Sequence, residues 1–266
     1  CLSGGCAQNS LANGKITTES SFKNVWIQPA AGDAGGALGA ALAVSNMRNG
    51  EKRNIMKSPS LGIKYSNDDI KKLLDSTDLS SFEQLFINDE NQLLDSVTNL
   101  LIQGKVIGFF HGSFEWGPRA LGNRSIIVDP RIKNMKDLLN KKIKKRESFR
   151  PFAPSILFEK VGEWFEKNEE VPFMTHVFNI KEEKRRLIPA VTHEDGTGRL
   201  QSVTKDFNNR YYKLIKLFGE KTNVPIILNT SFNENEPIVN TPKEALDCFL
   251  RTDMDSIVLE NYIISR

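Results

Sequence analysis

Cysteine is scarce in this sequence, with three residues among 266. Three thiols cannot build the paired framework that stabilises small secreted proteins, and a chain of this length can bury enough core not to need one. Long apolar runs are also missing, because none approaches the ~20 residues of a membrane-spanning helix. We therefore expect a globular cytoplasmic protein with no membrane partner.

A strong net charge is absent as well. Lysines and arginines number 36 against 33 acids, which leaves a formal charge of +3 and no global field to attract nucleic acid. The basic residues gather instead in residues 131–150, where nine of them stand with only two acids. The lysines of this run fit either a solvated helix face or a binding surface.

Glycine, proline and arginine are concentrated between residues 105 and 155. Gly112, Gly117 and Gly122 fall within one predicted loop, together with Arg119 and Arg124. Glycine lets backbone N–H groups approach a ligand closely, and the arginine guanidinium can bind two phosphate or carboxylate oxygens at once. This stretch therefore predicts a site for a small, multiply charged anion, with the rest of the chain forming its walls.

Hydrophobic periodicity predicts a mixed α/β (α+β) fold, with a sheet covered by helices. Short apolar runs predict strands at residues 25–28, 106–110, 125–128, 155–158, 174–179, 188–192, 199–203, 224–228 and 256–259. Amphipathic or small-residue patterns predict helices at residues 34–47, 66–74, 90–103, 135–145, 160–166, 207–220 and 242–251. Thr241, Pro242 and Glu244 form a helix-start signal, and Ser66 with Asp69 forms another.

Four polar stretches carry side chains that suit phosphate. They are EWGPRALGNRS (Arg119, Arg124), KIKKRESFRPF (Lys144, Arg146, Arg150), HEDGTGRLQSV (His193, Asp195, Thr197, Arg199, Gln201) and LNTSFNENEPIV (Asn229, Thr230, Ser231, Asn233). The last stretch follows the apolar run VPIIL, so it stands at the carboxyl end of a predicted strand, where open α/β sheets bind ligands. Cations that meet hydroxyl and amide donors predict phosphate-ester or acyl-phosphate chemistry. His193 fits a general base or a structural residue, and Asp195 fits a turn.

The first residues suggest part of a nucleotide-binding unit. LSGGCAQN places a Gly-Gly turn before a predicted helix, and free N–H groups at a helix start bind phosphate. Asp33 stands between glycines, just ahead of a small-residue helix, where its carboxylate fits either a helix cap or a metal or nucleotide contact. Because the sequence begins at CLSGG without Met, in the middle of such a unit, we expect a piece of a longer protein.

Six stretches resemble the O-carbamoyltransferases of the nodulation and antibiotic-tailoring type, which act on nodulation factors, aminoglycosides, cephalosporins and novobiocin-like compounds. The stretches are LSGGCAQNSLANGKI, QPAAGDAGGALGAAL, EWGPRALGNRSIIVDPR, KIKKRESFRPFAPSIL, HEDGTGRLQSV and LNTSFNENEPIVNTP. They occur in the order of that family and span almost the whole chain, which makes the resemblance specific.

The resemblance implies two domains and a staged reaction. Residues 1–57 would be the C-terminal end of an actin/Hsp70-like nucleotide-binding domain, residues 58–95 a linker with a helical entry, and residues 96–266 a YrdC-like domain similar to threonylcarbamoyl-AMP synthases. The second domain would cleave carbamoyl phosphate to carbamate and join the carbamate to ATP as carbamoyl adenylate. The first domain would pass the carbamoyl group to a hydroxyl of a small-molecule acceptor.

The resemblance also implies the site residues. Lys144, Arg150 and Arg199 look like the catalytic residues, and Arg119, Arg146, Asn229, Thr230 and Ser231 look like substrate-binding residues. Gly4, Gly5 and Asn9 look like nucleotide contacts, and Asp33 looks like a ligand of a divalent iron or magnesium ion. The other metal ligands of the family are histidines further upstream, which His111, His176 and His193 do not match. ATP and a divalent metal are therefore the expected cofactors, with the metal site incomplete in this stretch.

Two other interpretations stay open. A nucleic-acid-binding module would use the basic run at residues 131–150, although the near-neutral net charge and the lack of aromatics among those lysines disfavour it. A non-catalytic remnant would leave the site residues dispersed. If the resemblance holds, we expect this chain to keep the carbamoyl-phosphate/adenylate site without the transfer to an acceptor. A homodimer is compatible with that expectation.

Overall fold

The computed structural model describes residues 1–50, 56 and 58–266. Its centre is a nine-stranded sheet in the order β1-β9-β8-β2-β3-β7-β4-β6-β5. β2 pairs with β8 and β4 with β6 in parallel, whereas the other neighbours are antiparallel, so the predicted mixed α/β class is confirmed. The strands are β1 (Glu83–Phe86), β2 (Ile107–Phe110), β3 (Arg124–Val128), β4 (Ala153–Leu157), β5 (His176–Asn179), β6 (Thr197–Val203), β7 (Ile226–Ser231), β8 (Ser256–Leu259) and β9 (Tyr262–Ser265).

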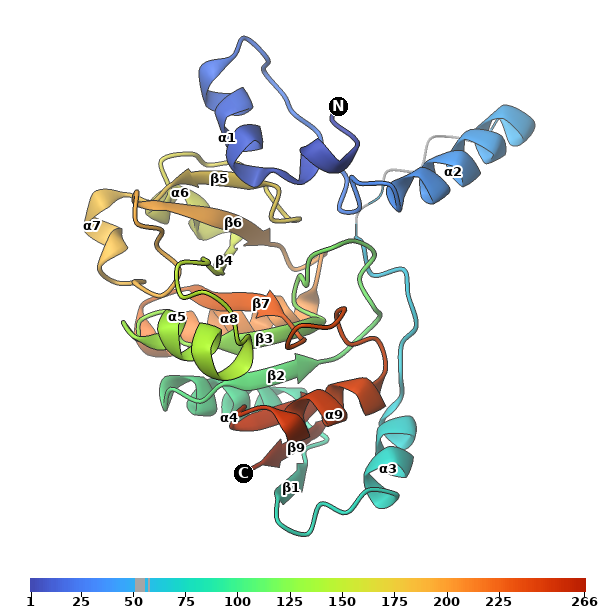
Figure 1. Ribbon diagram of the computed structural model, residues 1–266, viewed down its shortest axis with the longest axis vertical. Helices are drawn as coiled ribbons and strands as arrows, with labels where there is room; N and C mark the ends of the chain where they lie inside the picture. The colour runs from blue at the N-terminus through green and yellow to red at the C-terminus, as the bar shows by residue number, and fades with distance from the viewer. Residues whose placement is uncertain (51–55, 57) are drawn as a thin grey trace.

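Helices cover both faces of the sheet (Figure 1). α4 (Glu90–Ile102) and α8 (Asn209–Thr222) share one buried cluster with one face of the strands. α3 (Asn67–Asp75), α5 (Met135–Leu138) and α9 (Pro242–Arg251) share the cluster on the opposite face. Four short helical segments complete the domain. They are the π-helical η2 (Leu139–Ile143), the 3-10 helix η3 (Phe158–Lys160), α6 (Val161–Trp164) and α7 (Glu182–Arg185).

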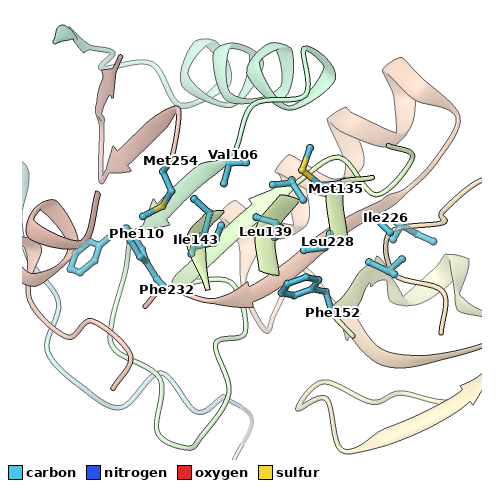
Figure 2. Close-up of a cluster of buried hydrophobic side chains, with 14 of the residues drawn as sticks. Val106, Phe110, Met135, Leu139, Ile143, Phe152, Ile226, Leu228, Phe232 and Met254 are labelled. Atoms are coloured by element: carbon cyan, nitrogen blue, oxygen red, sulfur yellow. The ribbon is translucent and has the colours of Figure 1, made fainter. Parts of the chain in front are cut away.

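The sheet separates the two clusters because successive side chains of a strand point to opposite faces. In β2, Phe109 packs in the cluster of α4 and α8, whereas Phe110 packs in the other. Figure 2 shows the second cluster, in which Phe110, Leu139, Ile143 and Phe152 are buried. This packing anchors η2 and the residue just before β4 to the sheet, and so fixes both ends of the basic loop between them.

Two capping boxes predicted from the sequence are present. Thr241 caps α9 and exchanges hydrogen bonds with Glu244, while Ser66 does the same with Asp69 at the start of α3. Side chains at these positions satisfy N–H groups that the first helical turn leaves free. Both helix starts were therefore readable from local chemistry alone.

Other predicted elements differ from the structure. Residues 188–192 do not form a strand, because the Val191 amide and the Thr192 hydroxyl both donate to the Ile188 carbonyl and close a turn. Residues 25–28 form only an isolated bridge, between Leu2 and Ile27. The predicted helix 135–145 changes to π-helical geometry at η2, and β7 continues to Ser231 instead of ending at residue 228.

The first 50 residues form η1 (Gly5–Gln8), α1 (Ser10–Glu19) and α2 (Gly35–Asn49). α1 packs beside β5, where the buried Asn13 donates from Nδ2 to the Thr175 carbonyl at 2.9 Å. α2 extends away from the sheet domain (Figure 1). The expected boundary at residue 57 lies outside the described residues, and within residues 58–95 β1 joins the sheet by pairing with β9. Of the helices described, none has the length and apolarity to cross a membrane.

Candidate functional site

A cavity of about 200 Å³ lies where several loops meet the end of β7. Its lining residues are Pro118, Arg119 and Ala120 from the β2–β3 loop, Arg146, Arg150 and Pro151 from the loop before β4, Met174 before β5, Arg199 on β6, and Asn229, Thr230 and Ser231 on β7. All the substrate-binding and catalytic residues predicted for this domain therefore line one cavity, with the exception of Lys144.

The polar end of β7 is held on both sides by neighbouring strands. Asn229 pairs with Ile127 of β3 and with Ala153 of β4, and Ser231 pairs with Ser125 of β3. The sequence predicted these polar residues in a loop after the strand, but they belong to the strand itself. A site built on a central strand is fixed more accurately than one on a free loop.

The arginines of the cavity have little negative charge near them. Arg150 lies 3.1 Å from Glu147, and Arg146 donates from Nε to Asn140 Oδ1 at 2.7 Å. Arg119 and Arg199 have neither a salt bridge nor a side-chain hydrogen bond to any residue that the structure describes. Since no described lining residue is an acid, the cavity is strongly electropositive.

Burial and mutual repulsion act on these guanidinium groups. Burial, followed by the charges of Arg119 and Arg146, lowers the pKa of Arg199 to about 9. Burial also lowers the pKa of Arg119, and burial together with Arg150 lowers that of Arg146. All of them stay protonated near neutral pH, so a bound anion would relieve their repulsion.

Lys144 lies behind the cavity wall instead of on it. Only 2% of this residue is exposed, and its Nζ donates to the Ser231 and Asn233 carbonyl oxygens at 2.5 and 2.8 Å and to Asn233 Oδ1 at 2.6 Å. Ser231 Oγ in turn donates to Asn233 Oδ1 at 2.7 Å. Lys144 therefore fixes the position of Ser231. Asn233 was named from the sequence in the polar stretch that suits phosphate, but not as a partner of Lys144.

A buried carboxylate, Glu115, organises the end of the β2–β3 loop that follows Arg119. Glu115 accepts hydrogen bonds from the amides of Leu121 and Asn123, each at 2.9 Å, and from that of Arg124 at 3.3 Å. Burial raises the pKa of Glu115 to about 7. A lone Glu in a Gly-rich loop gives no signal of such a role in the sequence.

Arg124, a loop arginine in the sequence analysis, has a structural role. It is fully buried as the first residue of β3, where its guanidinium stacks 3.6 Å from the Phe110 ring centroid. Its NH1 group donates to the His111 carbonyl at 2.7 Å. Arg124 therefore holds the start of the loop and does not reach the cavity.

The nucleotide and metal residues expected in the first segment lie together and exposed. The Gly4 amide donates to the Ala31 carbonyl at 2.7 Å, which brings the Gly4-Gly5 turn next to the turn that carries Asp33. Asn9 caps α1 by accepting from the Ala12 amide. Among the described residues no cluster of three or more His, Cys, Asp or Glu could hold a metal, so these residues alone do not form a metal site.

Comparisons with known proteins identify one family for both ends of the chain. Residues 98–266 match the family model for the carbamoyltransferase C-terminus, and residues 1–42 match that for the carbamoyltransferase N-terminus. The Synechocystis protein sll1178 is 43% identical, with all of this chain and 47% of that protein covered. The Sinorhizobium fredii nodulation protein NolNO is 42% identical, with 100% and 39% covered. The 3'-hydroxymethylcephem-O-carbamoyltransferase of Streptomyces clavuligerus is 30% identical, with 88% and 42% covered.

Solved structures give a weaker similarity. Full-length HypF superposes with a TM-score of 0.44 at 18% identity, covering 70% of this chain and 23% of HypF. Sua5 of P. abyssi superposes with a TM-score of 0.42 at 15% identity, covering 60% and 44%. The chain spans less than half the length of each of the curated relatives named above. The match to the C-terminal model covers more than half of the chain, and the chain therefore belongs to the carbamoyltransferase family.

Proposed function

We propose that the arginine-lined cavity is the carbamoyl-phosphate site of an O-carbamoyltransferase. The observation that supports this most directly is the convergence of Arg119, Arg146, Arg150 and Arg199 on a cavity without an acid among its described lining residues. Its volume of about 200 Å³ is below the ~300 Å³ at which pockets for drug-sized ligands begin, and so suits a small anion.

The proposed reaction follows from the charge distribution of the cavity. Carbamoyl phosphate and water give carbamate and phosphate, and the guanidinium groups of Arg119 and Arg199 stabilise the charge on the phosphoryl oxygens as the bond breaks. A carbamate oxygen then attacks the α-phosphorus of ATP, which gives carbamoyl adenylate and releases pyrophosphate. In the last step an acceptor hydroxyl attacks the carbamoyl carbon, and AMP leaves.

The remaining contacts belong to the same proposal. Gly4, Gly5 and Asn9 would contact ATP, and a divalent metal held in part by Asp33 would neutralise nucleotide charge in the whole protein. Backbone N–H groups near a helix start favour phosphate, which supports the placement of the nucleotide beside η1. The small-molecule acceptor, the adenylate step and the metal are proposed for the whole protein.

Binding of carbamoyl phosphate is the first test. We expect saturable heat exchange on titration of the wild-type chain, and a loss of about tenfold or more in affinity for Arg199→Gln, because a hydrogen bond to a charged group contributes about 1.5–3 kcal/mol. Arg186→Gln, the same change at an exposed arginine outside the cavity, is the control and should change affinity by less than about twofold.

The same titration can reject the proposal. A folded wild-type chain that binds neither carbamoyl phosphate nor inorganic phosphate has no anion site here. Equal losses in Arg199→Gln and Arg186→Gln would show that general charge, not the cavity, controls binding. Release of pyrophosphate from ATP that depends on carbamoyl phosphate tests the adenylate step separately.

A further inference from the structure

A buried asparagine of α1 connects the start of the chain to the wall of the cavity. Asn13 is 2% exposed, and its Nδ2 donates to the Ala7 carbonyl at 2.8 Å and to the Thr175 carbonyl at 2.9 Å. Because both partners are carbonyl oxygens, only the NH2 end of the amide fits this position. Asn13 therefore joins η1 to the residue that directly follows Met174, which lines the cavity.

The next residue brings the backbone of α1 against β5. A Cβ atom at Gly14 would lie 2.2 Å from the Val177 carbonyl oxygen, so the approach requires a residue without a side chain. Val177 pairs with Arg199 in the register of β5 and β6. The helix α1 therefore lies against the strand that is paired with a cavity arginine.

The first segment, residues 1–50, also contacts the β2–β3 loop. Gly117 stands two residues before Arg119 with φ at +134°, and a Cβ atom there would lie 2.6 Å from the Pro29 carbonyl oxygen. Two residues after Pro29, the Ala31 carbonyl accepts the hydrogen bond of the Gly4 amide at 2.7 Å. The segment that carries the Gly4-Gly5 turn therefore reaches the cavity wall from two sides.

Met174 needs support from its surroundings. Its φ is +55°, a left-handed conformation that non-glycine residues adopt at a cost and keep only where neighbouring contacts fix it. Its side chain packs in a small cluster with Leu121, Ala153 and Phe173. The hydrogen bond from Asn13 fixes the backbone on the other side, at Thr175. Both contacts together hold Met174 in the wall.

We propose that Asn13 is a positioning residue of the anion cavity, whose two hydrogen bonds hold the Met174 segment in the conformation that binds phosphate and thereby couple η1 to the cavity. This inference rests on the proposed function of the cavity and adds a contribution of the first segment to its shape. Because coupling between two parts of a protein is reciprocal, phosphate bound in the cavity stabilises the contact between α1 and β5.

The test is a titration of the wild-type chain and Asn13→Ala with inorganic phosphate, followed by NMR of the isotope-labelled methyl groups of the five methionines. Asn13→Ala should move the Met174 resonance, which Met174→Leu assigns, and leave those of Met135 and Met254 in place. Phosphate affinity should fall by about threefold or more, since one hydrogen bond corresponds to a factor of about 2–12. Asn24→Ala, the same change at an exposed position of the first segment, should leave resonance and affinity unchanged.

The outcomes separate this inference from the proposed function. If Asn13→Ala lowers stability but keeps the wild-type phosphate affinity and Met174 resonance, the residue is only structural, and the inference is overturned while the anion site stands. Absence of phosphate binding to the folded wild type would reject the anion site and this inference with it.

A measurement on the wild type decides if Asn13→Ala does not fold. Bound phosphate should slow hydrogen exchange of the α1 amides by about threefold or more, the same factor as in the affinity. Exchange of these amides at an unchanged rate in the phosphate-bound protein would overturn the coupling.

Discussion

Lys144 is a buried lysine. None of the described carboxylates forms a salt bridge with it. Burial lowers the pKa of Lys144 to about 7, and the charge of Arg146 acts in the same direction. Three oxygens of Ser231 and Asn233 lie within 2.8 Å of its Nζ, which matches the three hydrogens of an ammonium group. These hydrogen bonds favour the charged ammonium form, whereas burial disfavours it. Through them Lys144 holds the end of β7 in place.

Removal of the hydrogen bonds that Lys144 donates should destabilise the protein. Lys144→Met leaves the Ser231 and Asn233 carbonyl oxygens without their donor, and we expect the free energy of unfolding to fall by about 2–3 kcal/mol. Urea unfolding measures the change. Lys145→Met is the control, because Lys145 is exposed and loses only a surface salt bridge to Glu234, which contributes less than about 1 kcal/mol. Unchanged or higher stability of Lys144→Met would show that the burial penalty outweighs the hydrogen bonds.

Residue types were predictable at this site, but their contacts were not. Arginines in Gly- and Pro-rich loops predicted an anion site, and Arg119 and Arg199 do line the cavity. Lys144 was predicted among the same residues, yet its position behind the wall depends on where η2 ends relative to β7, which no local pattern specifies. The contacts of the Asn229 amide group to the Ala120 carbonyl and to Gln201 likewise join residues that are distant in sequence.

At the scale of elements, the β2–β3 loop depends on one carboxylate. Glu115 accepts three backbone N–H groups, yet burial raises its pKa to about 7 from an ordinary value of 4.5, with Arg124 opposing that shift. Because the pKa is higher in the folded state, the folded protein binds more protons than the unfolded chain between pH 4.5 and 7. The contribution of Glu115 to stability is therefore largest at low pH and falls as pH rises through 7.

Comparison of the wild type with Glu115→Gln tests this sign. The stability advantage of the wild type over the variant should be about 2 kcal/mol greater at pH 5 than at pH 7, as the proton uptake of one group with these pKa values requires. Urea unfolding at both pH values gives the difference. Glu194→Gln, the same change at an exposed position, controls for the loss of one negative charge. An advantage that grows from pH 5 to pH 7 would mean that the ionised, hydrogen-bonded form is the stable one.

Elements with strong local signals were predicted well, and elements made by pairing were not. α9 begins and ends where its capping box and its periodicity placed it. β1 was missed because all its residues are exposed and it exists through pairing with β9 at the sheet edge. Residues 188–192 have a strand-like composition, but Ile188 is buried inside a turn. The prediction of a strand was wrong because it rested on a short apolar run that does not alternate between apolar and polar residues.

For the whole molecule, the charge is nearly balanced while the cavity is not. The formal net charge is +3, yet four arginines line one cavity of about 200 Å³. Positive charge is therefore concentrated at one cavity, while the charge of the whole chain is nearly balanced. The basic run at residues 131–150 contributes Arg146 and Arg150 to the cavity, whereas its Lys133 and Lys141 are exposed.

Salt dependence distinguishes the cavity from a nucleic-acid surface. Carbamoyl phosphate carries about two charges and releases few counterions, so its affinity should fall by no more than about 20-fold between 50 and 200 mM NaCl. A protein that contacts 6–10 phosphates of a duplex would lose about 10³–10⁵ over the same range. Titrations of the wild-type chain with carbamoyl phosphate and with a fluorescent oligonucleotide measure both slopes.

Tight oligonucleotide binding that falls steeply with salt and is displaced by carbamoyl phosphate would place nucleic acid in the same site and contradict the small-anion assignment. Weak oligonucleotide binding beside a shallow slope for carbamoyl phosphate is the expected result, because a shaped cavity with few cations selects by geometry more than by charge.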